Sequence, residues 1–422
     1  MSASISPTVA NTIADRDPSL DATLDATRDG GRAVDSATTM RGTRGSTVLP
    51  RVESDDEGVR LVNDARERYA IERVLGEGGM GVVDLARDQD IERRVAIKRI
   101  RREAAGELGV ARFAEEVRTI GRLEHPNIVP VHDVGIDEHG RYFLVMKYVE
   151  GQTLEQIVEK LDAGDPETHR RYPFEARGQI FISLLRALAY AHDRGIIHRD
   201  VKPANVMVGP YGEVVLMDWG IARPIAGRDL PAPPDAPEAT ADGGKRRLVE
   251  TATTGLVGTP MYMSPEQARG ARDLDERSDL YSACVVFQEL LTLRHYLADR
   301  TTLPGVLTGV MSVEVPRPMS GDFWSAHPKQ GPAPAEYGHF VHRGMAKDRD
   351  ARWQSAHEMI EELERAHAGQ IRVQCPVTFS KRMTREAGRF IDRHPTMTMV
   401  GLSFCAVSLV AAIGGAIYAL AA

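Results

Sequence analysis

The most informative stretch of the chain reads Ile197-His198-Arg199-Asp200-Val201-Lys202-Pro203-Ala204-Asn205-Val206. It brings a carboxylate, a cation two residues later and an amide five residues later into one short polar segment. Asp200 can act as a general base, and the amide oxygen of Asn205 can ligate a hard cation such as magnesium. A polar loop that has this spacing by coincidence is a much weaker interpretation.

A second carboxylate follows in Val215-Leu216-Met217-Asp218-Trp219-Gly220. The apolar residues before Asp218 predict a short strand. A carboxylate at the end of such a strand can hold magnesium against bound phosphates. The two segments together therefore favour phosphate chemistry.

A glycine-rich segment nearer the N-terminus reads Gly76-Glu77-Gly78-Gly79-Met80-Gly81-Val82-Val83. Alone, this spacing is a weak signal, because a plain turn or a dinucleotide site also fits it. A dinucleotide site needs a helix directly after the glycines, whereas Val82, Val83 and Leu85 continue as a strand. The segment therefore predicts a hairpin whose glycines let backbone N–H groups approach phosphate oxygens.

Lys98 ends the strand-like segment Val95-Ala96-Ile97-Lys98. A lysine in such a strand is usually a solvated residue of the outer face, unless a carboxylate lies beside it. The following helical pattern offers two carboxylates, Glu115 and Glu116, and its spacing to the next His-Pro-Asn favours Glu116. The apolar face of that helix comprises Phe113, Val117, Ile120 and Leu123. A lysine paired in this way can present its ammonium group to nucleotide phosphates.

In this order the segments, with Ser264-Pro265-Glu266 further on, resemble the eukaryotic-like serine/threonine protein kinases of bacteria over about residues 69–366. The resemblance implies an α+β, bilobal protein kinase fold over residues 69–368, with a small β-rich N-lobe at about 69–146 and a larger helical C-lobe at about 150–368. The patterns agree, since strand-like segments precede a helical pattern at 179–192.

The resemblance also implies roles for individual residues. Asp200 looks like the catalytic base that takes the proton of the acceptor hydroxyl, and Lys202 looks like the lysine that steadies the γ-phosphate. Lys98, also catalytic, resembles the lysine whose ion pair with Glu116 marks the active conformation. Asn205 and Asp218 resemble the ligands of Mg²⁺ or Mn²⁺.

Structural and nucleotide-binding roles follow in the same way. Glu266 is expected to pair with Arg352, and Asp279 is expected to brace the catalytic loop. Met146 resembles the gatekeeper of an adenine-binding hinge. The residues expected to bind ATP are Leu75, Gly76, Glu77, Gly78, Gly79, Met80, Gly81, Val83, Ala96, Lys98, Glu116, Met146, Lys147 and Val149.

The implied function is transfer of the γ-phosphate of ATP to serine or threonine hydroxyls of protein substrates. Lys202 after the candidate base and the segment Gly258-Thr259-Pro260 are typical of serine/threonine rather than tyrosine kinases. Two alternatives are a pseudokinase scaffold, which the intact Lys98, Asp200, Asn205 and Asp218 argue against, and a small-molecule phosphotransferase, which usually lacks the Ser-Pro-Glu segment.

Thr251 and Thr253 lie in the predicted activation loop, shortly before Gly258. A phosphate on either residue can pair with the guanidinium of Arg199, which is next to the candidate base. We therefore expect autophosphorylation at Thr251 or Thr253 to raise activity, although these can also be ordinary polar loop residues.

The composition is that of a soluble globular protein, with 42% hydrophobic and 27% charged residues among 422. The formal net charge of −7 lacks the basic footprint of a nucleic-acid binder, so no nucleic-acid partner is expected. Cys284, Cys375 and Cys405 have neither metal-ligand nor disulfide spacing, which favours a reducing compartment.

The two ends of the chain differ in character. Residues 1–65 are rich in small and polar residues without apolar periodicity and are predicted to be disordered. Residues 369–395 form a basic juxtamembrane linker, and residues 396–420 are uncharged and apolar all round, which predicts a transmembrane helix. The alternative, a buried C-terminal helix, would normally show a polar stripe.

Basic residues on the N-terminal side of the apolar run place the kinase side in the cytoplasm. We therefore expect a single-pass protein of the cytoplasmic membrane whose C-terminal helix contacts the lipid bilayer. Ala411, Gly415 and Ala419 form a small-residue stripe in that helix that can support a homodimer, but such stripes are common by chance.

Overall fold

The computed structural model describes residues 51–55, 58–62, 67–77, 81–100, 107–137, 139–220, 222–225, 259–318, 323–324, 327–400, 403–404, 406–408, 411 and 413. Several predicted features lie outside these residues. They are the chain up to residue 50, Gly78, Gly79 and Met80 of the glycine-rich segment, the candidate phosphosites Thr251 and Thr253, and Gly415 and Ala419 with most of the apolar run.

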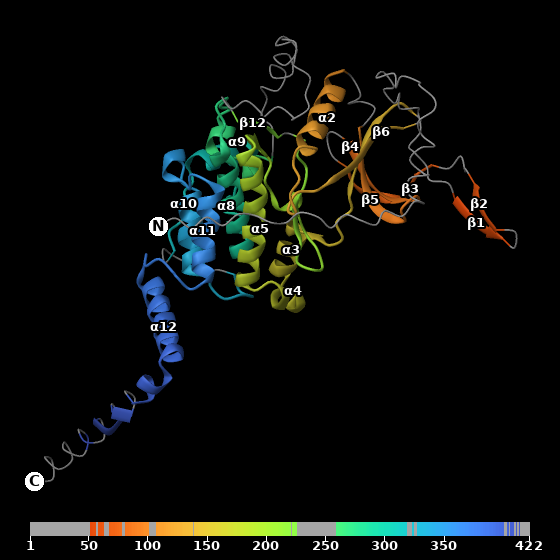
Figure 1. Ribbon diagram of the computed structural model, residues 1–422. Coiled ribbons are helices and arrows are strands. Elements are labelled where there is room, and N and C mark those ends of the chain that lie inside the picture. The colour runs from red at the N-terminus through yellow and green to blue at the C-terminus, as the bar shows by residue number, and fades with distance from the viewer. Residues whose placement is uncertain are drawn as a thin grey trace, which may run out of the picture. The chain divides into compact units, whose positions relative to one another are not determined.

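The N-terminal lobe is an antiparallel sheet in the order β3-β4-β5-β7-β6 (Figure 1). Alternate residues of its strands face opposite sides. Val95 and Ile97 are buried on one side, whereas Ile100 packs with Phe113 of helix α2 (Glu107–Ile120) on the other. Lys98 therefore lies on the side of the sheet that α2 covers. The strands are β3 (Tyr69–Glu77), β4 (Gly81–Asp88), β5 (Arg93–Ile100), β6 (Val131–Ile136) and β7 (Tyr142–Lys147).

The C-terminal lobe is built around helices α5 (Phe174–Asp193) and α8 (Glu276–Thr292), most of whose residues are buried. Phe181 of α5 stacks on Phe287 of α8, with ring centroids 4.1 Å apart. Figure 1 shows α11 beside α5. The surrounding helices are α3 (Leu154–Ala163), α4 (Pro166–Arg171), α7 (Pro265–Ala268), α9 (Leu303–Ser312), α10 (Ala335–Gly344) and α11 (Ala356–His367). A β-rich lobe followed by a helical lobe confirms the bilobal prediction.

Short strands position the polar segments of the sequence. Strand β9 (Ile196–Ile197) pairs with β12 (Arg223–Pro224), and β10 (Val206–Val208) pairs with β11 (Val214–Leu216) and β8 (Gln152–Thr153). The segment that carries Asp200 thus lies between β9 and β10 and includes the 3₁₀ turn Pro203–Asn205. Asp218 follows β11 directly.

The segment between α2 and β6 contacts strand β11 of the C-terminal lobe. Its Asn127 donates a side-chain hydrogen bond of 2.8 Å to the carbonyl of Val214, and Ile128 forms a parallel bridge with Leu216. These contacts attach the chain that follows α2 to the strand that precedes Asp218. The carboxylates of Glu116 and Asp218 are therefore brought together by backbone pairing.

A hairpin precedes the N-terminal lobe, within the segment predicted to be disordered. Strands β1 (Arg51–Asp55) and β2 (Gly58–Val62) pair antiparallel, with Asp55 opposite Gly58. The structure thus places a hairpin in part of the stretch predicted to be disordered, and residues 1–50 lie outside the described residues. The backbone hydrogen bonds between β1 and β2 order this stretch, although the composition of residues 1–65 is polar.

Helix α12 (Pro376–Arg393) occupies most of the predicted basic linker. An ion pair of 2.9 Å between Lys381 and Glu336 joins it to α10. The segment 369–395 is thus largely helical and is not an extended connection. Among the residues that the structure describes, no helix combines the length and the apolar character needed to cross a membrane.

Candidate active site

Asp279, at the start of α8, holds the backbone of the segment that carries Asp200. Its buried carboxylate accepts hydrogen bonds from the backbone N–H groups of His198 (2.7 Å) and Arg199 (2.8 Å). It also contacts the imidazole of His192 at 2.8 Å. Burial alone would raise the pKa of Asp279, but the contact with His192 and the other hydrogen bonds outweigh it and hold the pKa below its ordinary value. Asp279 therefore sits where a brace of the catalytic loop was predicted.

The two polar segments are joined through His198 and Trp219. The ring of His198 forms a hydrogen bond of 3.0 Å with the carbonyl of Met217 and packs edge-on against the indole of Trp219. Trp219 is completely buried. Asp218, between these contacts, has a positive φ of 58°, a conformation that most residues avoid. The packing of its neighbours thus stabilises an unusual backbone conformation at Asp218.

The carboxylate of Asp200 is held on both oxygens. Oδ2 accepts a hydrogen bond of 2.7 Å from the ammonium of Lys202, and Oδ1 accepts bonds from the backbone N–H (2.9 Å) and hydroxyl (3.1 Å) of Thr259. Lys202 also donates to the hydroxyl of Thr259 at 2.9 Å. This contact of Thr259 with the candidate base was not predicted. Its only signal in the sequence was its place in the Gly-Thr-Pro segment.

Lys98 contacts two carboxylates. Its ammonium lies 2.5 Å from Oε1 of Glu116 and 3.2 Å from Oδ1 of Asp218. Burial would lower the pKa of Lys98, but the charges of Asp218 and Glu116 outweigh it and raise the pKa, so the lysine stays charged. Glu115, the alternative partner, is exposed on the same helix. The structure thus brings together the pair that the sequence favoured.

Several predicted nucleotide-binding residues share one face of the N-terminal sheet. Val83 lies opposite Lys98, and Ala96 lies opposite Met146, in the strand registers. At Gly81 a side chain would clash with the carbonyl of Arg99, so only glycine fits the start of β4.

Apolar residues of the C-terminal lobe continue this surface. Val149 is buried together with Val215, and Met207 and Met217 pack against them beside Met146. Met207 and Met217 were not predicted, because an isolated methionine has no sequence signal for a site. Of the other predicted residues, Leu75, Gly76 and Glu77 end β3, and Lys147 is exposed at the end of β7.

Asn205 and Asp218 have the chemistry that magnesium requires. The amide nitrogen of Asn205 donates to the carbonyl of Asp200 at 2.9 Å, which leaves the amide oxygen as the group that can ligate a cation. Partial burial would raise the pKa of Asp218, but the nearby charge of Lys98 outweighs it and lowers the pKa, so this carboxylate is ionised. The described residues contain no cluster of three acidic, His or Cys ligands. These donors fit a magnesium ion that takes its other ligands from phosphates and water.

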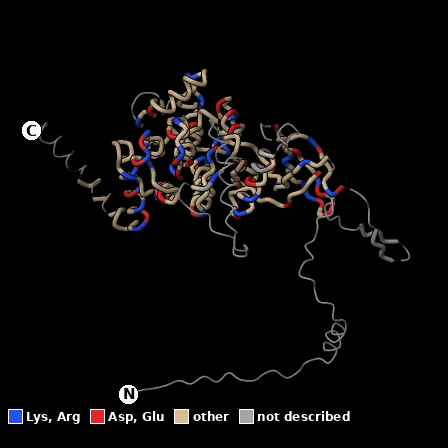
Figure 2. Tube along the Cα trace, turned by 90° about the horizontal axis from the view of Figure 1, so that it is seen from above, with Lys and Arg blue, Asp and Glu red and all other residues tan. Residues whose placement is uncertain are grey.

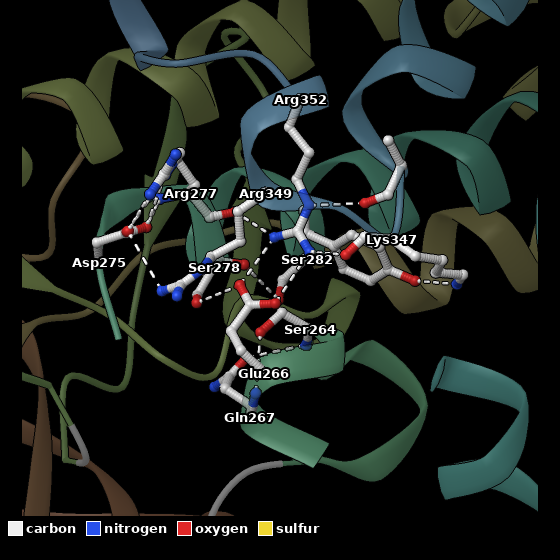
Figure 3. A network of polar contacts seen from close by, with 12 residues as sticks. Ser264, Glu266, Gln267, Asp275, Arg277, Ser278, Ser282, Lys347, Arg349 and Arg352 are labelled. Atoms are coloured by element: carbon white, nitrogen blue, oxygen red, sulfur yellow. Dashed lines mark hydrogen bonds and ion pairs between the residues drawn. The ribbon is translucent and has the colours of Figure 1, made fainter. Parts of the chain in front are cut away.

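A buried ion pair supports the segment that follows Thr259. The guanidinium of Arg352 makes two parallel hydrogen bonds to Glu266, of 2.8 and 2.9 Å, and Glu266 also accepts a bond of 2.7 Å from Ser278 (Figure 3). Gln267, whose side chain closes a capping box with Ser264, donates to the carbonyl of Arg199 at 2.9 Å. The pairing predicted for Glu266 is therefore present, and Gln267 adds a link to the catalytic segment.

Comparison with known proteins agrees with this geometry. A family model described as "Protein kinase domain" matches residues 69–363. The chain belongs to the protein kinase family. The chain is 35% identical over 318 residues to serine/threonine-protein kinase PknB of Mycobacterium tuberculosis, and the match covers 72% of the chain and 44% of the relative.

Other relatives give the same assignment. PknB of Mycolicibacterium smegmatis is 36% identical over 311 residues, covering 72% of the chain and 44% of the relative. PknD of Protochlamydia amoebophila is 33% identical over 304 residues, covering 70% of the chain and 29% of the relative. The chain thus matches less than half the length of these curated relatives.

Proposed function

We propose that the chain is a serine/threonine protein kinase that uses ATP and Mg²⁺ or Mn²⁺. One observation carries the proposal: the carboxylate of Asp200 is held by Lys202 and Thr259, while Lys98 joins Glu116 to Asp218. The contacts of Thr259 with Asp200 and of Lys98 with Asp218 join segments 59 and 120 residues apart, and each involves a group that phosphoryl transfer needs. The relatives named above carry the same activity in their names.

Asp200 acts as the base in this proposal. It accepts the proton of a serine or threonine hydroxyl while the hydroxyl oxygen bonds to the γ-phosphorus and the bond to ADP breaks. Lys202, whose ammonium is 2.7 Å from Asp200, stabilises negative charge on the transferred group. Lys98 binds the remaining phosphates. Asn205 and Asp218 would hold the magnesium ion, which would supply positive charge beside the phosphates.

Two other functions are less well supported. A scaffold without catalysis has no need for an oriented Asp200 or for a charged Lys98 beside Asp218. A small-molecule phosphotransferase has no need for the ordered segment from Thr259 to Ala268, which lies directly against the candidate base.

The substrate class is tested by offering the full chain, in detergent with ATP and magnesium, three sets of acceptors. We expect phosphate on serine or threonine in protein and peptide acceptors. Transfer to tyrosine peptides and to small alcohols and amines should be at least about tenfold slower, which corresponds to a difference in activation free energy of about 1.4 kcal/mol. Transfer to small molecules alone would contradict the proposal. Binding of ATP without transfer to any acceptor would support the scaffold.

Activation by autophosphorylation is part of the same proposal. The Nε atom of Arg199 is buried and has no hydrogen-bond partner among the described residues. Burial and the neighbouring charge of Arg223 lower the pKa of Arg199. A phosphate that docks here relieves the repulsion between two guanidinium groups and satisfies an unpaired donor.

Replacing both candidate phosphosites (Thr251→Ala with Thr253→Ala) is expected to lower the rate of substrate phosphorylation about tenfold, since one ordered charge-assisted contact is worth about 1.5 kcal/mol. The measurement is the initial rate after preincubation with ATP, compared with a chain treated with phosphatase. Thr301→Ala with Thr308→Ala, at two exposed threonines outside the activation loop, is the control. Equal rates for the double variant and the unchanged chain would contradict activation through these threonines.

Location is proposed from the sequence. The chain is a single-pass protein of the cytoplasmic membrane, with its kinase domain in the cytoplasm and its lipid contact in residues 396–420. The uncharged apolar composition of that run and the basic residues of α12 before it support this location. Pairing of two copies through Ala411, Gly415 and Ala419 stays a prediction.

A further inference from the structure

Helix α12 has a polar edge that packs on the C-terminal lobe. Lys381 pairs with Glu336 at 2.9 Å, and Thr378, near the start of the helix, is fully buried. Arg385 and Arg389 donate to the carbonyls of Ala366 and Ala368 at the end of α11. Cations are favoured there, because the last carbonyls of a helix carry partial negative charge. This edge therefore holds α12 against the lobe.

The opposite side of α12 is apolar and exposed. Phe379, Met383 and Phe390 recur at helical spacing on one stripe, and 53%, 51% and 55% of their surfaces are exposed. Ile391 lies further round the helix than these three residues and is 48% exposed. A helix that only completed the lobe would turn such residues inward, yet here the basic edge is turned inward instead.

The charges of α12 favour an anionic partner. Five basic and two acidic residues give the helix a net charge of +3, in a chain whose formal net charge is −7. Elsewhere Lys and Arg are interspersed with Asp and Glu (Figure 2). Arg382 and Arg393 flank the apolar stripe, and Arg382 pairs with Glu386 at 2.7 Å. A second copy of the chain would bring another helix of the same sign against this one, which argues against a dimer here.

The sequence after α12 indicates what covers the stripe. Residues 396–422 carry no charge, and Met397, Met399 and Val400 are exposed like the stripe itself. An apolar stripe flanked by arginines and followed at once by such a run is typical of a helix that lies at a bilayer surface. A protein partner would explain the stripe but not its continuation into the uncharged run.

We propose that α12 is an interfacial helix that binds the surface of a bilayer containing anionic lipids. Its stripe of Phe379, Met383 and Phe390 enters the boundary between headgroups and acyl chains. Arg382 and Arg393, which flank the stripe, contact lipid phosphates. The basic edge of α12, which contacts α10 and α11, then fixes the orientation of the kinase domain relative to the membrane. The inference rests on the proposed membrane anchorage of residues 396–420.

The test places a fluorophore on the stripe or beside it. The full chain carries Cys375→Ser and Cys405→Ser; Cys284 stays unlabelled, because it is buried and burial raises the pKa of its thiol. Either Met383→Cys or Thr384→Cys is labelled with an environment-sensitive dye. The second position is also exposed but lies off the stripe. Both chains are reconstituted into nanodiscs of phosphatidylcholine, with or without phosphatidylglycerol.

With phosphatidylglycerol, the dye at position 383 is expected to shift to the blue and to be quenched by brominated lipid about twofold more than the dye at 384. The difference should shrink without anionic lipid. Equal quenching at both positions in chains that have entered the nanodiscs would overturn the interfacial helix but not the membrane anchorage. A difference that does not depend on phosphatidylglycerol would overturn the proposed preference for anionic lipid. Protection of position 383 in lipid-free detergent that grows with protein concentration would assign the stripe to a second copy. A chain that does not co-elute with the nanodiscs would overturn the anchorage and this inference with it.

Discussion

Replacing the candidate base by its amide (Asp200→Asn) is expected to lower the rate of phosphate transfer by about 10²- to 10⁴-fold. The amide cannot take up the proton of the acceptor hydroxyl at neutral pH. Its remaining oxygen can still accept the hydrogen bonds that Thr259 donates to Oδ1. The fold and the affinity for ATP should therefore change little. The measurement is kcat for a serine peptide, together with binding of a fluorescent nucleotide.

A matched control is available at Asp299, an exposed carboxylate that pairs with Arg294 on the surface. Asp299→Asn makes the same chemical change and should leave kcat within a factor of two, because exposed ion pairs contribute about 0–1 kcal/mol. If Asp200→Asn kept more than a tenth of the activity, Asp200 would not be the base. If it lost nucleotide binding and thermal stability together, its role would be structural.

The largest effect on stability is expected at Arg352. Its side chain is almost fully buried, makes two hydrogen bonds to Glu266 and donates to the carbonyls of Ala346, Lys347 and Arg277. Arg352→Met leaves the buried carboxylate of Glu266 without its cation. We expect the free energy of unfolding to fall by about 3–5 kcal/mol, which chemical denaturation of the kinase fold would measure.

Two further variants separate loss of charge from loss of geometry. Arg352→Lys keeps the charge but cannot make two parallel bonds, so its destabilisation should be intermediate. Glu266→Gln combined with Arg352→Met removes the uncompensated charge and should recover part of the lost stability. If the double variant were less stable than Arg352→Met, the buried charge would not be the cause.

The pH dependence of stability gives an independent check of the same pair. Burial would raise the pKa of Glu266, but the hydrogen bonds and charge of Arg352 outweigh it and lower the pKa. A lowered pKa in the folded state contributes stability that is complete above the ordinary pKa of a glutamate. That contribution is lost as the pH falls through the lowered value. The difference between the unchanged chain and Glu266→Gln should therefore shrink in acid.

The sequence by itself determined the family, the two lobes and the segments that carry the chemistry. Strands β3 to β5 and helix α5 were predictable because their apolar periods are local properties. Lys98, Asp200, Asn205 and Asp218 were predictable because each lies in a short motif with its own spacing. The pair of Glu266 and Arg352, 86 residues apart, came from the family resemblance and has no local signal.

Only the tertiary structure decided which distant residues meet. Thr259 reaches Asp200 across 59 residues, and Met207 and Met217 join Met146 from the other lobe. Such contacts depend on the register of β10 with β11 and on the packing of α7 and α8, which no local pattern specifies. The same holds for α12. The sequence shows the spacing of its apolar residues, but the outward orientation of these residues follows from contacts of the opposite side of the helix. There Lys381 binds the start of α10, and Arg385 and Arg389 bind the end of α11. Physically, a periodic pattern defines the faces of a helix, and long-range contacts select the face that remains exposed.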